Sequence, residues 1–158
     1  MRFPLFFLFL LFTSAFLGLA SCDEIADSRI PPARVALNAN INHYKELQGL
    51  KIDGGYATIT RRLNASTYIG YGGLLICRSK YGDNQVYAYD LACPVENKPT
   101  VKLDFKDGLI AVCPQCHSEF DSVIFGNPQP SKGIARDKGY HLRVYRASWT
   151  DPVIAVRN

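Results

Sequence analysis

The feature that most constrains the fold is a succession of short β-type runs, broken by turn signals, that starts near residue 35 and continues to the end of the chain. Turn sequences such as DGG at 53–55, YGDN at 81–84 and KDG at 106–108 separate them, and the only expected helix is a turn around NHYKELQ. Many short strands with frequent turns predict an all-β fold, an antiparallel sandwich or small barrel. The runs are RVALNANI, YATITRRL, TYIGYGGLLIC, QVYAYDLAC, TVKLDF, LIAVC, DSVIF, YHLRVYRA and PVIAVRN.

Two of these runs allow a finer prediction. TYIGYGGLLIC is the richest in apolar residues, which favours a central place in the sheet. In QVYAYDLAC, apolar residues at Val86, Ala88 and Leu91 indicate one buried face with a period of about two.

The N-terminal 21 residues are not expected to belong to the folded domain. Arg2 is followed by a long apolar run and then by small residues that lead into Cys22, which is the pattern of a secretion signal. The sequence LASC also resembles a bacterial lipobox, in which the cysteine becomes a lipid-modified N-terminus; the alternative is a plain signal with Cys22 an ordinary thiol. We therefore expect a signal peptide at 1–21, a lipidated N-terminus and linker at 22–34, and one domain at 35–158, tethered to a membrane of the bacterial cell envelope by lipid rather than by a helix.

Charge and motif content argue against several functions. The formal net charge is only +4 and the basic residues form no clustered stripe, so nucleic-acid binding has no support. No nucleophile–base pair, phosphate loop or second domain is present that would indicate an enzyme. The expected partners are the membrane, through the lipid anchor, and an unidentified redox or structural protein.

The cysteines are the residues of this chain that indicate lipid attachment, metal binding or disulfide formation. Of the five, Cys22 is assigned to the lipid, and the other four belong to an exported chain, where free thiols tend to oxidise. The stretch CPQCHSEFD, with Cys113 and Cys116, is compatible with a redox dithiol, part of a metal site or a disulfide. A thioredoxin-type dithiol needs a helix that begins at the second cysteine, whereas β-branched and turn-forming residues follow here. We therefore interpret the stretch CPQCHSEFD as part of a metal site or as a disulfide.

A second cysteine box lies about twenty residues upstream. ACPVEN contains Cys93, and the hairpin sequence TVKLDFKDGLIAV separates it from Cys113. Both boxes have the order Cys-Pro and both follow a predicted strand. Two cysteine loops presented by adjacent hairpins predict a small cluster-binding subdomain.

At these residues the sequence resembles the Rieske iron–sulfur family. The lead-in YAYDLACP, the box CPQCHSEFD, and the proline loop GNPQP followed by HLRVY stand in the order of the family, and the resemblance covers residues 35–145. It implies a Rieske-like antiparallel β fold that carries a 2Fe–2S cluster for one-electron transfer. It also implies that Gly126, Pro128 and Pro130 belong to a loop that shields the cluster from solvent.

The family's ligand set is incomplete in this chain. The family motifs are Cys-x-His and Cys-x-x-His-Gly-x-x-Phe, so Cys93 and Cys113 match the cysteine ligands, while Val95 and Cys116 stand where the histidines are expected. His117 follows in place of the glycine. A slip of one residue would make His117 the ligand, but Phe120 would then lose its family spacing, and we prefer Cys116.

Three outcomes remain open for the site. The first is a 2Fe–2S cluster on Cys93, Cys113 and Cys116, with the fourth position filled by His117, Glu96, water or a partner's side chain. The second is a tetrahedral zinc, which thiolates with a nearby histidine or carboxylate suit well. In the third, the thiols pair as a disulfide, no metal is bound and the domain is a binding or structural module. Cys77 is expected to be a core thiol, and His43 and His141 to be surface or structural residues.

Overall fold

A computed structural model describes residues 28–106, 110–121 and 123–158. The predicted signal peptide and Cys22 lie outside this range. Within it, no helix is both long enough and apolar enough to span a membrane.

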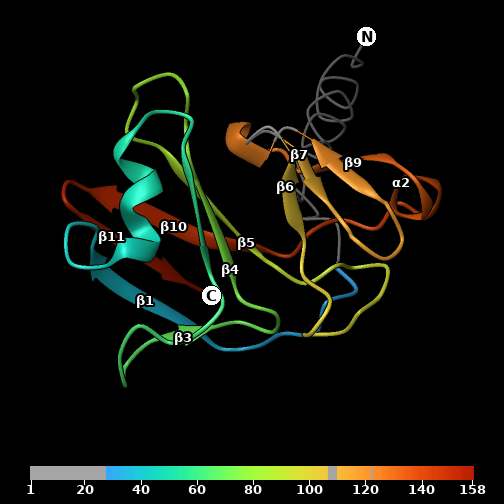
Figure 1. Cartoon of the computed structure of the whole chain (residues 1–158), viewed down its shortest axis with the longest axis horizontal. Coiled ribbons are helices and arrows are strands. Elements are labelled where there is room, and N and C mark those ends of the chain that lie inside the picture. Colours follow the sequence, from blue (N-terminus) through green and yellow to red (C-terminus); the bar gives the residue numbers. More distant parts are fainter. Residues whose placement is uncertain (1–27, 107–109, 122) are drawn as a thin grey trace, which may run out of the picture.

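The described chain is built mainly from antiparallel strands in two sheets (Figure 1). The larger sheet has seven strands in the order β2-β4-β5-β10-β11-β1-β3 and curves into a nearly closed barrel. Its strands are β1 (Val35–Asn40), β2 (Tyr56–Ile59), β3 (Tyr68–Ile69), β4 (Leu74–Arg78), β5 (Val86–Asp90), β10 (Val144–Thr150) and β11 (Val153–Arg157).

The smaller sheet has four strands in the order β6-β7-β8-β9 and lies beside the barrel (Figure 1). Its strands are β6 (Asp104–Lys106), β7 (Ile110–Val112), β8 (Glu119–Asp121) and β9 (Gln129–Lys132). The helical elements are short: η1 (Lys45–Lys51), η2 (Val123–Phe125) and α2 (Ile134–Lys138). The prediction of an all-β antiparallel fold with a two-hairpin subdomain is therefore confirmed.

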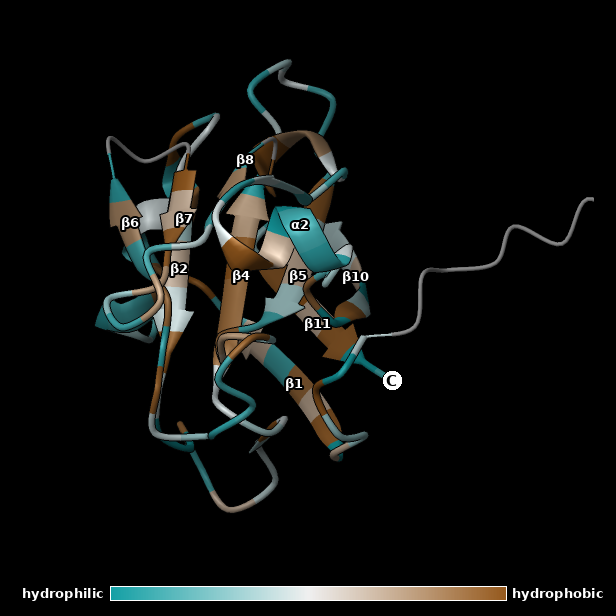
Figure 2. Ribbon diagram, turned by 90° about the vertical axis from the view of Figure 1, so that its right-hand side faces the viewer, coloured by the Kyte–Doolittle hydropathy of each residue, from teal (hydrophilic) through white to brown (hydrophobic). Residues whose placement is uncertain are grey.

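Two apolar clusters form the core, and β5 contributes to both. Val86 and Ala88 pack inside the barrel, whereas Tyr89 and Leu91 pack in the cluster beneath the smaller sheet. The predicted buried face is thus present at Val86 and Ala88, whereas Leu91, predicted on the same face, packs in the other cluster with Tyr89, because the smaller sheet covers this side of the chain. Figure 2 shows the hydrophobic character of β4, in which Leu74 to Cys77 are fully buried.

Most predicted strands are found, with local differences, and β9 was not predicted because its first residues fall in the expected proline loop GNPQP. The apolar run at 67–77 is divided, because the glycine-rich turn at 70–73 separates β3 from β4. The run at 121–125 does not continue as a strand after β8 and instead forms the 3₁₀ turn η2. The expected turn at NHYKELQ is found as η1, whereas α2 was not predicted.

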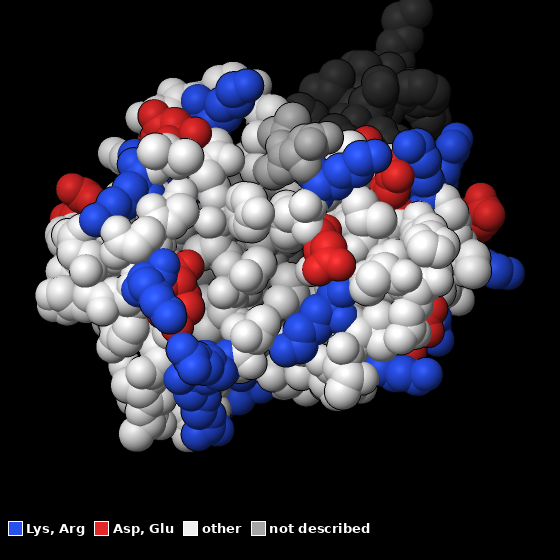
Figure 3. Space-filling view, in the orientation of Figure 1, with Lys and Arg blue, Asp and Glu red and all other residues white. Residues whose placement is uncertain are grey.

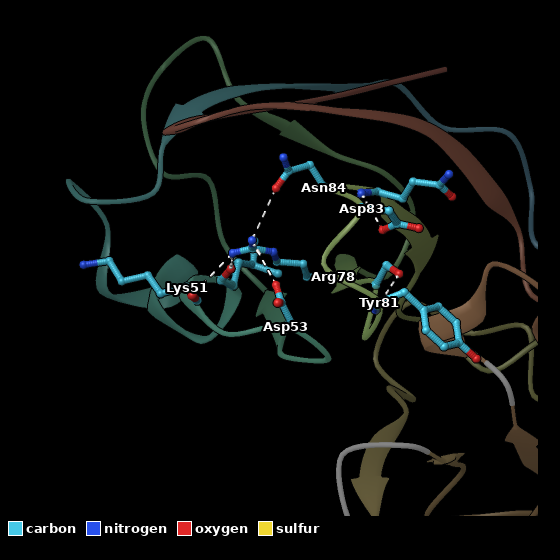
Figure 4. A network of polar contacts seen from close by, with 9 residues as sticks. Lys51, Asp53, Arg78, Tyr81, Asp83 and Asn84 are labelled. Carbon is cyan, nitrogen blue, oxygen red and sulfur yellow. Dashed lines mark hydrogen bonds and ion pairs between the residues drawn. The ribbon is translucent and has the colours of Figure 1, made fainter.

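Arg78, at the end of β4, connects η1 to the barrel through hydrogen bonds and an ion pair (Figure 4). Its Nη1 donates to the carbonyl oxygens of Leu50 and Lys51, at 3.1 and 3.3 Å, and its Nη2 lies 2.9 Å from Asp53 Oδ1. The guanidinium also lies over the Trp149 ring, 4.9 Å from its centroid. This network explains why a short 3₁₀ helix keeps a fixed position against the barrel.

The described part of the predicted linker packs on the domain. Ile30 is fully buried, and its carbonyl accepts a 2.7 Å hydrogen bond from Arg143 Nε. Ser28 Oγ donates to the carbonyl of His141 at 2.9 Å. The sequence predicted a linker up to residue 34, and its described part contacts the domain at Ser28 and Ile30, where the isoleucine side chain gains a place in the core.

Charged side chains of both signs are interspersed on the face shown in Figure 3. Lys and Arg do not merge there into one continuous basic surface. This distribution agrees with the mild net charge of the sequence.

Candidate metal centre

The Cys93 loop, residues 93–97, lies between β5 and β6 in a closed hairpin. The N–H of Leu103 donates to the carbonyl of Leu91 at 2.9 Å, and the N–H of Cys93 donates to the carbonyl of Val101 at 3.0 Å. An isolated bridge joins Ala92 to Lys102 between them. The chain on both sides of the loop is therefore held in fixed register.

The Cys113 loop, residues 113–117, connects β7 and β8 in the smaller sheet. Ala111 pairs with Phe120 and Val112 with Glu119 in the flanking strands. The N–H of Cys113 donates to the carbonyl of Ser118 at 2.9 Å and closes the hairpin. The two cysteine loops thus come from neighbouring hairpins, as the sequence predicted.

Both loops have the same backbone turn. The carbonyl of Cys93 accepts from the N–H of Asn97 at 2.9 Å, and the carbonyl of Cys113 accepts from the N–H of His117 at 3.0 Å. The fifth residue of each loop is left-handed, with φ of 50° at Asn97 and 54° at His117. Asparagine and histidine are among the residues that tolerate this conformation, so two different sequences form one turn.

The two loops bring three sulfur atoms together. The Sγ atoms of Cys93, Cys113 and Cys116 all lie within 4.8 Å of one another, and those of Cys93 and Cys116 are 3.6 Å apart. A tetrahedral zinc with Zn–S bonds of about 2.3 Å separates its sulfur ligands by about 3.8 Å. The three cysteines are therefore close enough to hold one metal ion.

Burial keeps two of these thiols protonated in the absence of a metal. It raises the pKa of Cys93 and, likewise, of Cys113. Backbone N–H groups two and three residues further on act in the opposite direction: those of Val95 and Glu96 on Cys93, and those of Gln115 and Cys116 on Cys113. In each loop these two N–H groups favour the thiolate form of the first cysteine, which can form once a cation offsets the cost of burial.

Cys116 is the thiol of the three that ionises most readily. Burial is the largest single influence on it and acts to raise its pKa, but hydrogen bonds from Ser118 and from the neighbouring thiols together lower it. Its Sγ lies 3.3 Å from Ser118 Oγ, which also accepts the N–H of Ala135 at 3.1 Å. The hydroxyl proton of Ser118 is therefore free to be donated to the sulfur once Cys116 is ionised.

The buried carboxylate of Asp90 holds the backbone at the start of the Cys93 loop. Asp90 is fully buried and accepts the N–H groups of Tyr71, Gly72 and Ala92, at 2.7, 2.9 and 2.9 Å. It also accepts the hydroxyl of Tyr145 at 2.7 Å. Because Ala92 directly precedes Cys93, this network fixes the point at which the loop begins.

The other predicted site residues lie outside the sulfur cluster. His117 is exposed and is not within the 4.8 Å group. Gly126, whose φ is 80°, lies against the Tyr87 ring, which a Cβ at this position would approach to 2.4 Å. Pro128 is buried, and Pro130 lies in β9, where it pairs with Phe120.

The remaining candidate residues are structural in the described fold. Cys77 is fully buried in the apolar cluster, and burial raises its pKa to about 12. His43 is exposed, and His141 is half-buried at the point where Ser28 contacts the domain.

Sequence reasoning missed three residues that contact the cysteine loops, among them Tyr71, whose hydroxyl donates to the carbonyl of Asn97 at 3.1 Å. Arg29 Nη1 lies 3.2 Å from the carbonyl oxygen of Val95 and 3.4 Å from that of Pro94, and the guanidinium stacks on the Tyr140 ring. Ser118 is the third. A serine two residues after a cysteine was the only signal for it, and no local pattern connects Arg29 with a loop more than sixty residues away.

Comparison with known proteins does not identify a family for this chain. No family model matches the chain, and no curated protein matches it. Among solved structures, the NMR structure of the E. coli protein NirD is similar with a TM-score of 0.38 and 15% sequence identity, over 81% of this chain and 96% of that chain. A likeness at this level assigns neither family nor function.

Proposed function

We propose that this is an exported, lipid-tethered domain, related to the Rieske proteins, that binds one thiophilic metal ion through Cys93, Cys113 and Cys116. The observation that carries the proposal is the sulfur triangle, in which all three atoms lie within 4.8 Å of one another. Membrane attachment rests on the sequence around Cys22 alone.

Zinc is the ion that this donor set suits best. Zinc sites of structural type are tetrahedral and use mainly thiolates and imidazoles, with a carboxylate as a further possible ligand. Soft thiolate donors disfavour magnesium and calcium. The three cysteines belong to two different loops, so an ion at this point would link both loops and stabilise the smaller sheet.

The 2Fe–2S cluster that the family resemblance implies fits the residues less well. Such a cluster takes four protein ligands, two on each iron. Here Val95 occupies one histidine position and cannot ligate, and the three available sulfurs are grouped closely enough to share a single ion. We therefore assign the domain a binding or structural role and derive no electron-transfer step.

One observation keeps the electron carrier as a second candidate function. The Cys-Pro loops lie at the ends of two adjacent hairpins in the order of the Rieske family. A fourth ligand from a partner would complete the requirement for a cluster.

Metal analysis of protein purified anaerobically, together with a visible absorption spectrum, tests the proposal. We expect about one zinc per chain and a colourless protein. Two irons and two sulfides with visible absorption bands would establish the electron carrier instead. If the protein binds no metal, even after reduction and incubation with zinc or with iron and sulfide, both metal-binding hypotheses are wrong. The domain would then be a binding or structural module without a metal.

A further inference from the structure

We infer that Glu96 supplies the fourth ligand, so that the two cysteine loops form a Cys₃Glu site. The inference rests on the proposed function, because it names the missing ligand of that same site. It is carried by the structural equivalence of the two loops.

The equivalence is seen in three independent features. Each loop begins Cys-Pro and is closed by a hydrogen bond from its fifth N–H to its first carbonyl, at 2.9 Å in one loop and 3.0 Å in the other. Each fifth residue is left-handed, with φ values that differ by only a few degrees. In each loop the N–H groups of the third and fourth residues act to lower the pKa of the first thiol.

Residue-by-residue matching of the loops pairs Glu96 with Cys116. Cys93 corresponds to Cys113 as the first residue, and Asn97 corresponds to His117 as the fifth. The fourth residue of the Cys113 loop directs its sulfur to within 3.6 Å of the first sulfur of the opposite loop. The same backbone turn in the Cys93 loop gives the fourth residue, Glu96, the equivalent direction toward Cys113.

The environment of Glu96 permits the required side-chain rotation. Glu96 is half-buried, as Cys116 is, and its carboxylate makes no hydrogen bond or ion pair with any residue in the described ranges. Its carboxylate is not within the 4.8 Å group, so ligation requires its longer side chain to turn toward the sulfurs, a movement that breaks no hydrogen bond or ion pair of the carboxylate in the described ranges. A carboxylate oxygen is an established zinc ligand, at about 2.0–2.2 Å.

The rival ligand within the chain is His117, and the loop geometry does not favour it. His117 is exposed, and its counterpart in the other loop is Asn97. The fifth position serves in both loops to close the turn through its backbone N–H. Nothing in the turn directs the fifth side chain toward the sulfurs.

Zinc affinity and cobalt(II) spectra of the full chain test this assignment. Glu96→Gln should weaken zinc binding by more than about tenfold, because even an outer-shell partner of a metal ligand costs that much. Glu96→Cys should retain tetrahedral cobalt binding and strengthen the sulfur-to-cobalt charge-transfer bands, since a fourth thiolate is added. His117→Asn and the exposed-carboxylate variant Asp104→Asn should leave both readouts unchanged, and circular dichroism confirms that each variant is folded.

The outcomes separate this inference from the proposed function. Wild-type protein that binds zinc with the same affinity as Glu96→Gln would overturn the role of Glu96 and leave the three-thiolate site intact. Loss of binding in His117→Asn alone would assign the ligand to His117. Wild-type protein that binds neither ion would overturn both.

Discussion

Cys93 Sγ and Cys116 Sγ lie 3.6 Å apart, although they belong to different loops and are separated by 23 positions in the chain. A disulfide bond requires a sulfur separation of about 2.05 Å, so a small movement of either side chain would join them. The same two sulfurs are needed as metal ligands. Metal binding and disulfide formation are therefore alternative states of one site.

Oxidation of the metal-free protein should produce a Cys93–Cys116 disulfide. Oxidised glutathione takes up the two electrons and two protons, and Cys116, whose pKa is lowered, provides the attacking thiolate. Peptide mapping without reduction should find this pair, with Cys113 and Cys77 still alkylatable after unfolding. A Cys113–Cys116 bond would contradict the predicted pairing, and zinc-loaded protein should oxidise much more slowly.

Asp90→Asn should destabilise the domain by about 2–4 kcal/mol. The carboxylate accepts three backbone N–H groups and the Tyr145 hydroxyl, and an amide in its place would direct an NH₂ group at one of these donors. Tyr145→Phe, which removes only one of the four bonds, is the matched control and should cost about 1 kcal/mol. Urea denaturation of both variants measures the difference. Equal losses would show that the backbone bonds contribute nothing.

The buried thiol of Cys77 should make the metal-free domain less stable at alkaline pH. Burial raises its pKa from 9.0 to about 12, so the folded state retains a proton that the unfolded chain has already released. The stabilisation is complete below pH 9 and is lost as the pH rises toward 12; at pH 10 the loss should be about 1.4 kcal/mol.

Cys77→Ala is the control for this pH dependence. The variant should be less stable at pH 7, because a buried side chain is shortened, but its stability should fall less between pH 8 and pH 10 than that of the wild type. Chemical denaturation at each pH gives the two curves. Parallel curves would show that folding does not change the pKa of Cys77.

Arg29→Ala should loosen the Cys93 loop. The guanidinium lies within hydrogen-bonding distance of the carbonyl oxygens of Pro94 and Val95 while it stacks on Tyr140. Its removal should speed amide hydrogen exchange at Val95, Glu96 and Asn97 and weaken zinc binding several-fold. Arg61→Ala, at an exposed ion pair with Glu46, is a matched control that should change neither. Unchanged exchange in Arg29→Ala would show that Arg29 does not contribute to holding the loop.

Cys22→Ser should leave the domain folded but release it from the membrane fraction or block its processing. The reason is the small-residue sequence that leads into Cys22, which predicts a lipidated cysteine. Fractionation and mass analysis of the mature protein test this. Normal maturation and membrane retention of the variant would disprove the lipoprotein assignment.

The sequence predicted that the cysteines lie close together, because the same short Cys-Pro pattern occurs twice, each time after a predicted strand. Two Cys-Pro boxes, each after a strand and with a hairpin between them, require neighbouring loops once the strands pair. The equivalence of the two turns could not be predicted. Asn97 and His117 share no chemistry, and they are alike only in accepting a left-handed backbone.

The segment before residue 35 shows the limit of local reasoning most clearly. Pro31 and Pro32 indicate a spacer, and no pattern within the segment indicates that Ile30 is fully buried. Its place in the core is made by Arg143, which is distant in sequence and donates to its carbonyl. Tertiary contact here outweighs a composition that is typical of linkers.

If Cys22 is lipidated, the attachment of residues 28–30 also limits the distance between the cysteine loops and a bilayer. Arg29 contacts the Cys93 loop directly, and Cys22 is seven residues earlier in the chain. Even fully extended, seven residues reach only about 25 Å. If Cys22 is lipidated, the loops must therefore remain close to the headgroup layer. A protein that contacts them would have to approach along the plane of the membrane, so the short tether would select partners that are themselves membrane-bound.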